Sequence, residues 1–257
     1  VIDTLTQAII KSIPVGLEPT DLALTEESSD LLVMNTSDPS IQRINLTSLE
    51  ITETYELQEF SNRNDDVGGH LADGPGDVIY YVDEQWGPRL RVFDTSTETV
   101  LQTFGAESDN SNNTSNDNGF GDFLVSRDKT RIYGWKQYGD GAGSSGTGVV
   151  RFDIAPDGTL SNFFNGPASN SENFTREPFD TPVLLTRNED RLIIKDAWID
   201  PETLQVIQRY PDEIYSVTPN GAVTASIAAF YPSYGGEELE NFGGPYPVQT
   251  ILPDYSY

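Results

Sequence analysis

The chain has 257 residues, of which 41 are acidic and 15 are basic, and its formal net charge at pH 7 is −26. A surface this negative repels phosphate groups, which excludes nucleic acid as a partner and disfavours anionic membrane surfaces. The absence of cysteine excludes a disulfide framework and thiol chemistry, and no apolar run approaches the roughly 18 residues of a membrane span.

Four short runs of apolar or alternating residues follow one another between residues 14 and 57. Leu22–Leu24 and Leu31–Met34 are the apolar runs, and residues 41–46 and 51–57 alternate between apolar and polar side chains. Alternation with a period of two is typical of half-buried β-strands. Polar turns separate the four runs, so the segment predicts one four-stranded antiparallel unit, of the length that a propeller blade needs.

The first residues of the chain correspond to only the second half of such a unit. Residues 1–3 and 8–15 predict two strands joined by a turn. The segment VIDTLTQAIIKSIPVG matches VFDTSTETVLQTFG, residues 92–105, in its Asp-Thr, Thr, apolar and Gly positions. The chain is therefore expected to begin in the middle of a blade.

Similar units recur along the rest of the chain, with longer connections between them. Residues 179–228 contain one predicted strand too many for a single blade, so the boundaries are least defined there. The predicted blades of this single domain, 1–257, cover residues 17–57, 68–105, 120–166 and 179–228, and a composite blade joins 243–257 to 1–16.

These units predict an all-β fold, a β-propeller of four-stranded antiparallel blades. Four internal blades and one composite blade formed by the two ends of the chain would make a closed five-bladed ring, in which the composite blade removes two exposed sheet edges. The alternative is a fragment of a propeller with six to eight blades.

The repeated segments resemble the YVTN-type β-propeller repeat, including its surface-layer members. The resemblance is carried by Gly16-Leu17-Glu18-Pro19, by Asn35, and by the turns Ile2-Asp3-Thr4 and Phe93-Asp94-Thr95. It implies a propeller fold for the chain. The family contains surface-layer proteins, binding modules and a few enzymes, so the resemblance implies no single function.

The three tryptophans, Trp86, Trp135 and Trp198, each come after the expected second strand of a blade. At equivalent loop positions on one face of a ring they would form an aromatic platform for a carbohydrate or a peptide, together with Arg89 and Tyr138. The alternative is that each tryptophan packs between neighbouring blades.

Acidic residues in two polar loops raise the question of calcium. Asp65 and Asp66 lie in one loop, and the low-complexity segment 106–122 carries many Asp and Asn residues. Their oxygen atoms are the ligands that Ca²⁺ prefers, although the spacing does not match an EF-hand, and plain solvation of a polar loop is the alternative. The candidate calcium ligands are Asp109, Asp117 and Asp122.

His70, the single histidine of the chain, is expected at the start of an inner strand near the ring axis. With Asp65, Asp66 and Glu84 nearby in sequence, it is a candidate general base. The alternative is an ordinary hydrogen-bonding residue. The Gly-rich segment 139–148 is expected to be a hairpin tip, since no helix follows it that could bind phosphate.

These features favour an exported, non-catalytic propeller that acts as a binding, adhesive or assembly module of a cell-surface or extracellular structure. The expected partners are a protein, a surface glycan or further copies of the chain. The alternative is a hydrolase or lyase that uses carboxylates in the central channel on a carbohydrate or a small ester. A third hypothesis is a ligand-binding accessory protein of the periplasm.

Overall fold

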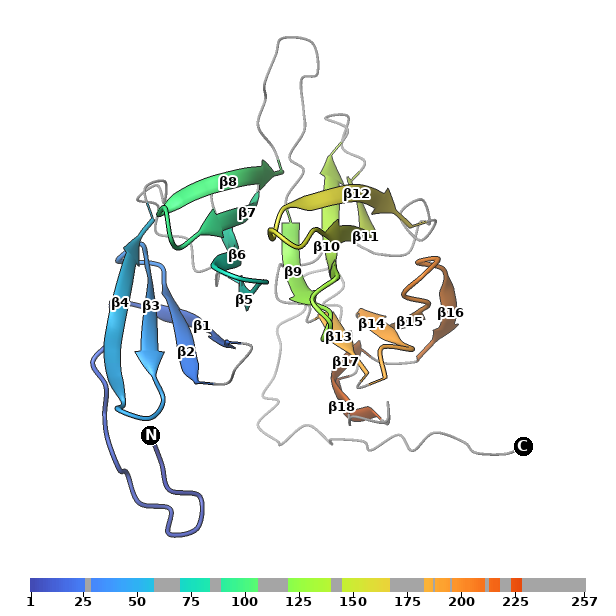
Figure 1. Cartoon of the computed structure of the whole chain (residues 1–257). Coiled ribbons are helices and arrows are strands. Elements are labelled where there is room, and N and C mark those ends of the chain that lie inside the picture. The colour runs from blue at the N-terminus through green and yellow to red at the C-terminus, as the bar shows by residue number, and fades with distance from the viewer. Residues whose placement is uncertain are drawn as a thin grey trace, which may run out of the picture.

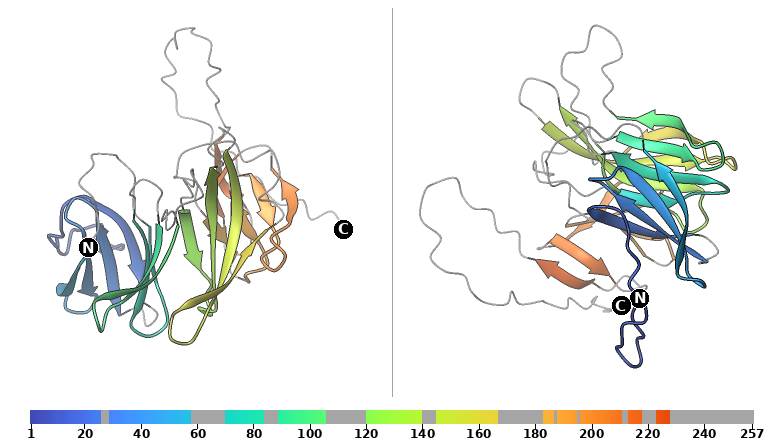
Figure 2. Two further views of the ribbon diagram at one scale, coloured as in Figure 1. Left: turned by 90° about the horizontal axis from the view of Figure 1, so that it is seen from above. Right: turned by 90° about the vertical axis from the view of Figure 1, so that its left-hand side faces the viewer.

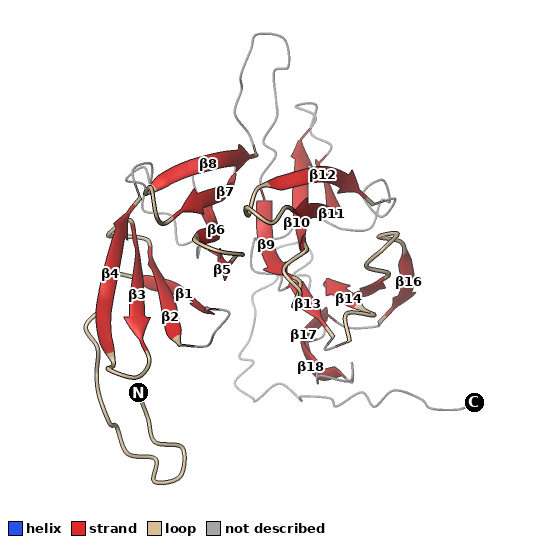
Figure 3. Cartoon of the chain, in the orientation of Figure 1, coloured by secondary structure: helices blue, strands red, loops and turns tan. Residues whose placement is uncertain are grey.

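The computed structural model of the chain is built from β-strands. The structure describes residues 1–25, 29–57, 70–83, 89–105, 120–139, 145–166, 183–186, 188–194, 196–210, 213–217 and 223–227. Within these ranges there are 18 strands and no α-helix (Figure 3). In this part of the chain no helix has the length and hydropathy that crossing a bilayer requires.

Four of the sheets contain four strands each, and these are the blades of the molecule. The first blade consists of β1 (Pro19–Leu24), β2 (Asp30–Asn35), β3 (Ser40–Asn45) and β4 (Glu50–Glu56). The second consists of β5 (His70–Asp73), β6 (Val78–Asp83), β7 (Arg89–Asp94) and β8 (Thr99–Phe104). The third consists of β9 (Phe120–Val125), β10 (Arg131–Gly139), β11 (Ser145–Ile154) and β12 (Leu160–Asn165).

The fourth blade has shorter strands, and a two-stranded sheet follows it. The blade consists of β13 (Val183–Leu185), β14 (Leu192–Ile194), β15 (Ala197–Ile199) and β16 (Val206–Arg209). The last sheet consists of β17 (Glu213–Val217) and β18 (Val223–Ile227). Within each sheet, strands that are neighbours in sequence order pair antiparallel, and the sheets follow one another around a common centre (Figure 1; Figure 2).

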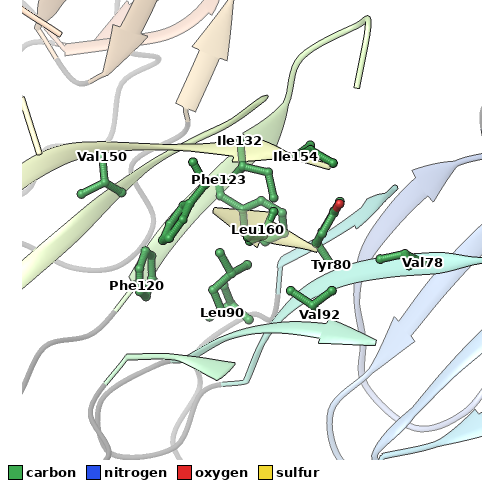
Figure 4. Packing of buried hydrophobic residues seen from close by; sticks show 12 residues of the cluster. Val78, Tyr80, Leu90, Val92, Phe120, Phe123, Ile132, Val150, Ile154 and Leu160 are labelled. Carbon is green, nitrogen blue, oxygen red and sulfur yellow. The ribbon is translucent and has the colours of Figure 1, made fainter. Parts of the chain in front are cut away.

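Neighbouring blades pack face to face because their second strands carry apolar side chains on both sides. In β6, Val78, Tyr80 and Val82 pack against the third blade, whereas Ile79 and Tyr81 pack against the first. Figure 4 shows the cluster between the second and third blades. Burial on both faces of each sheet, with side chains alternating between the two, is the packing that stacks blades around an axis.

The turn between the third and fourth strands is the same in three blades. An Asn or Asp at this turn accepts hydrogen bonds from the N–H groups two and three residues later, and the fourth residue after it has a positive φ. The acceptors are Asn45, Asp94 and Asp200, and the positive-φ residues are Leu49, Glu98 and Leu204, with φ of 56°, 53° and 54°.

The structure confirms the all-β, four-stranded architecture of a β-propeller and changes two expectations about its blades. The strands within 179–228 belong to two sheets, β13–β16 and β17–β18, because the short strands of the fourth blade are complete by Arg209. Within the described residues the segment 1–16 pairs only with itself, through a bridge between Ile2 and Ile9. Residues 243–257, its expected partner, lie outside the described residues.

Candidate functional site at the inner strands

The inner strands of the blades line the centre of the molecule. β1 lies beside β5, β5 beside β9, and β9 beside β13 (Figure 1). Side chains at the same level of these strands therefore meet, although they come from segments far apart in the sequence. Ligands of propellers and barrels bind where such a mouth collects polar groups, so this is the part of the molecule where a site is sought.

Two aspartates at equivalent positions of the inner strands join neighbouring blades. Asp21 Oδ2 accepts a hydrogen bond of 2.8 Å from the N–H of Leu71 in the second blade, and Asp122 Oδ2 accepts one of 2.7 Å from the N–H of Val183 in the fourth. The other oxygen of each carboxylate accepts the N–H of the next residue in its own strand, at 2.7 Å in both cases. Both carboxylates are thus bound to the backbone of two blades.

His70 stands between these two aspartates in the order of the blades. Its Nδ1 lies 3.1 Å from Asp122 Oδ1, and its side chain is 24% exposed. The structure therefore places His70 on an inner strand, as the sequence predicts. The acidic partner that the structure gives it is Asp122, whereas Asp65, Asp66 and Glu84 lie outside the described residues.

The environment of Asp122 favours its neutral form more than water does. Burial raises the pKa of the Asp122 carboxyl above its ordinary value, and the charge of Asp21 adds to this rise, whereas His70 and the two N–H donors oppose it. Desolvation outweighs these opposing contacts because the carboxylate lies largely inside the protein. A histidine beside a buried carboxyl is an arrangement that can hold and move a proton.

A cavity of about 300 Å³ lies between the inner strands of the first three blades. Its walls carry apolar side chains from β1, β5 and β9, among them Ala23, Leu71, Ala72 and Leu124, together with the polar residues Asp73, Ser126, Arg127 and Lys129. Three blades thus contribute to one concave surface with apolar walls and a few polar groups, which is typical of a binding pocket.

The charged groups at this cavity include an ion pair. Lys129 Nζ lies 2.6 Å from Asp73 Oδ2 and donates a hydrogen bond of 2.8 Å to the carbonyl oxygen of Gly74. Both side chains of the pair are mostly buried. The pair links the second and third blades and offsets the charge that either residue would otherwise bring to the pocket.

Trp135 and Trp198 do not occupy the loop positions that the sequence analysis expected. Trp135 lies within β10 and is buried between the third and fourth blades, where a Cβ on Gly121 would lie 2.0 Å from its ring. Trp198 lies within β15, because the turn after β14 is too short to leave it in a loop, and the Arg191 guanidinium stacks over its ring at 4.1 Å. Trp86 lies outside the described residues.

Of the remaining predicted site residues, the structure places Arg89 and Tyr138 in different blades. Arg89 is the first residue of β7, in register with Asp83, and Tyr138 lies near the end of β10. Of the candidate calcium ligands, Asp122 is described, and both of its oxygens already accept hydrogen bonds. Asp109 and Asp117 lie outside the described residues. Among the described residues no group of three His, Cys, Asp or Glu side chains could hold a metal ion.

Asp21 was not predicted as a site residue, although a pattern in the sequence could have found it. Asp21 and Asp122 each stand four residues before a hydroxyl residue, Thr25 or Ser126, with three apolar residues between. Each of these hydroxyls accepts a backbone N–H at the start of the second strand, from Asp30 or Arg131. The repeated pattern Asp, three apolar residues, then Ser or Thr marks the inner strand.

The comparisons with known proteins support the propeller fold, but they do not assign the chain to a family. No family model matches the chain, and no curated protein sequence matches it. A functionally unknown protein from Desulfotomaculum acetoxidans is similar in structure, with a TM-score of 0.58 and 14% identity over 88% of this chain and 68% of that protein.

Two further solved structures are similar at lower TM-scores. For the β-propeller domain of Myceliophteria thermophila Cps50 (Swd1) the TM-score is 0.49, with 12% identity over 83% of this chain and 63% of that one. For Kuenenia stuttgartiensis hydrazine synthase the TM-score is 0.42, with 11% identity over 76% of this chain and 66% of that one. The chain thus spans about two thirds of the length of the solved structures it resembles.

Proposed function

We propose that this chain is a non-catalytic binding module whose inner-strand cavity receives an apolar side chain of a protein partner. The observation that carries the proposal is the lining of that cavity, where Ala23, Leu71, Ala72 and Leu124 meet from three blades. Apolar concave surfaces gain affinity by removing a partner's apolar side chain from water. The Asp73–Lys129 pair is already neutralised, which suits an uncharged group.

A second candidate, a hydrolase that uses carboxylates, is favoured by one observation. The imidazole of His70 lies beside the buried carboxyl group of Asp122, and a histidine positioned by a carboxyl group can act as a general base. Against it, both oxygens of Asp21 and both of Asp122 accept backbone N–H groups. Carboxylates with these contacts stabilise the packing of the strands, so we rank the hydrolase below the binding module.

We further propose that the module is exported and works at a cell surface, in the extracellular space or in the periplasm. The proposal is supported by the charge of −26, which suits a protein exposed to salt. Labelling of intact source cells with an antibody, with and without external protease, tests it. Protection of the protein from external protease until the cells are lysed would contradict a cell-surface location.

Peptide selection followed by calorimetry tests the binding function. Peptides selected from a displayed random library on the intact chain are synthesised and titrated against wild type, Ala72→Phe and Ala23→Phe, the two substitutions that fill the cavity from different strands. We expect both variants to lose about tenfold or more in affinity. Ile207→Phe, at an exposed site on β16, is the matched control and should bind as wild type does.

Circular dichroism of each variant separates loss of binding from loss of fold. Peptides that bind the filled variants as tightly as wild type would exclude the cavity as the site. In parallel, hydrolysis of p-nitrophenyl esters is measured with wild type and with His70→Asn. If wild type hydrolyses the esters and His70→Asn does not, the hydrolase becomes the favoured function in place of the binding module.

A further inference from the structure

The N-terminal segment carries the turn that elsewhere joins the outer two strands of a blade. Asp3 Oδ1 accepts hydrogen bonds from the N–H groups of Leu5 and Thr6, at 2.8 and 3.3 Å, and Gln7 has a φ of 59°. These are the contacts of the turns at Asn45, Asp94 and Asp200, at the same offsets along the chain.

The strand register on either side of that turn is also the register of an outer blade half. Ile2, the residue before Asp3, bridges to Ile9, seven positions further along. In the three blades the residue before the turn pairs with the residue seven positions on in the same way: Ile44 with Ile51, Phe93 with Val100, and Ile199 with Val206. Residues 1–15, called here the N-terminal hairpin, therefore have the turn and the register of the third and fourth strands of a blade.

The N-terminal hairpin has the apolar side chains of a packed blade without the packing. Ile2 is 62% exposed, whereas its counterparts Ile44, Phe93 and Ile199 are buried, at 3% or less. Ile9 and Ile10 are also exposed, and the hairpin projects away from the first blade (Figure 1; Figure 2). Apolar side chains left in water favour contact with any surface that can bury them.

The sheet β17–β18 is the complementary half. It lies at the other end of the arc, where Ile214 of β17 is fully buried against Ile193 of the fourth blade. β17 thus takes the place of an inner strand and β18 that of a second strand. In the part of the chain that the structure describes, the outer edge of β18 pairs with no strand.

We propose that the N-terminal hairpin adds to β18 of the same chain and completes a four-stranded closing blade from β17, β18, residues 1–4 and residues 8–15. This assignment moves the inner half of the composite blade from 243–257 to 213–227. Closure pairs an exposed strand edge and buries Ile2, as the corresponding residues of the other blades are buried. It is independent of what the cavity binds.

Register predicts which residues meet in the closed blade. In the first, second and fourth blades the residue before the turn pairs with the second-strand residue that also pairs with the last residue of the inner strand. The aligned residues are Leu24, Leu31 and Ile44, then Asp73, Ile79 and Phe93, and then Leu185, Leu192 and Ile199. In the last sheet Val217, the last residue of β17, pairs with Val223 of β18, so Ile2 is expected opposite Val223.

A cysteine pair tests this contact, because the chain has no cysteine of its own. The full chain with Ile2→Cys and Val223→Cys is oxidised, and a disulfide within the monomer is expected on a non-reducing gel and in the peptide mass spectrum. The control pair Ile2→Cys and Ile207→Cys places the second cysteine on the outer strand of the fourth blade. It should form the bond at least about tenfold more slowly.

Three outcomes would overturn the proposal. They are a disulfide only between two chains, no disulfide at all, or equal rates for the test and control pairs. Hydrogen exchange of the unmodified chain provides a second measurement that needs no variant. Amides of residues 1–4 and 8–15 are expected to exchange about tenfold or more slowly than in a free peptide of that sequence, and exchange at the free-peptide rate would contradict closure.

Discussion

The carboxylate of Asp122 meets groups from three blades: it accepts the N–H of Phe123 and the N–H of Val183, and it lies beside the imidazole of His70. Asp21 repeats two of these contacts between the first and second blades. In the second blade the equivalent place belongs to His70, so the boundary between the second and third blades is joined by a side-chain pair. In each of the first three blades, one inner-strand residue thus makes a polar contact with the next blade.

Replacing Asp122 by alanine is expected to lower the free energy of unfolding by about 1–3 kcal/mol, because the buried N–H of Val183 loses its acceptor. Urea denaturation followed by tryptophan fluorescence measures the loss. Asp38→Ala, at an exposed residue, is the control and should change stability by less than about 0.5 kcal/mol. Equal stability of Asp122→Ala and wild type would show that this contact does not hold the blades together.

The raised pKa of Asp122 has a consequence for stability with a definite sign. Folding favours the protonated carboxyl, so the contribution is fully present below the ordinary pKa of 3.8 and is lost as pH rises through the folded value. We expect the stability of wild type minus that of Asp122→Asn to fall with rising pH, from about pH 4 until Asp122 is fully ionised. Denaturant unfolding at several pH values measures this difference.

Asp157→Asn gives the matching test with the opposite sign. Hydrogen bonds from the hydroxyl and the N–H of Thr159 hold the pKa of Asp157 below its ordinary value. Its contribution is present above pH 3.8 and is lost as pH falls through the lower folded value. The difference between wild type and Asp157→Asn should therefore rise with pH. Parallel slopes for the two variants would contradict the assignment for Asp122.

At the scale of elements, the alternation of side chains along β6 decides how three blades pack. Tyr80 is fully buried on the side of the third blade, and its hydroxyl donates a 2.8 Å hydrogen bond to the carbonyl oxygen of Gly158. On the outer strands, Gln102 of β8 both donates to and accepts from the backbone of Leu160 in β12, at 3.1 and 2.6 Å. Polar contacts therefore accompany the apolar ones at the inner and the outer edge of this interface.

Tyr80→Phe isolates the hydroxyl that crosses between the second and third blades. The variant keeps the ring and leaves the Gly158 carbonyl without this donor, so we expect a loss of about 1 kcal/mol in the free energy of unfolding. Tyr133→Phe is the matched control, because the Tyr133 hydroxyl accepts a hydrogen bond from Arg131 of its own strand. A larger loss for Tyr133→Phe than for Tyr80→Phe would contradict a bridging role for Tyr80.

The sequence predicts strands more reliably than it predicts which blade they belong to. The alternation in β3 and the apolar run in β2 predict those strands because both are consequences of burial along a single segment. Residues 213–227 read as strands too, yet their membership in a separate sheet depends on the packing of Ile214 against Ile193, which is a contact between distant segments. The sheet to which these strands belong could therefore be assigned only from the structure.

The same limit applies to the candidate site. His70 was predictable as a singular titratable residue on an inner strand. Its partner Asp122 lies 52 positions away along the chain and was predicted only as a calcium ligand. Trp135 reads as an exposed aromatic when only the sequence is considered, because nothing in it shows that Gly121 leaves room for the ring. Contacts between blades decide all of these roles, and no local pattern reports them.

At the scale of the whole molecule, the dominant feature is the excess of acidic over basic residues. Several of the basic side chains are engaged in ion pairs with acids, as in Arg43 with Glu53, Arg131 with Glu202 and Arg209 with Asp196. With 41 acidic and 15 basic residues, most carboxylates have no basic partner available. The folded chain holds these charges closer together than the unfolded chain does, so repulsion among them opposes folding.

Salt should therefore stabilise the protein. Raising NaCl from about 0.01 M to 0.15 M shortens the screening length from about 30 Å to 8 Å, and we expect the melting temperature to rise by about 2–4 °C, which corresponds to roughly 1 kcal/mol for a domain of this size. Differential scanning calorimetry measures the shift. Tetramethylammonium chloride at the same ionic strength is the control, because it screens charge while offering no small cation for carboxylates to bind. Equal shifts would assign the effect to screening, whereas a lower melting temperature in both salts would mean that the ion pairs outweigh the repulsion among the unpaired carboxylates.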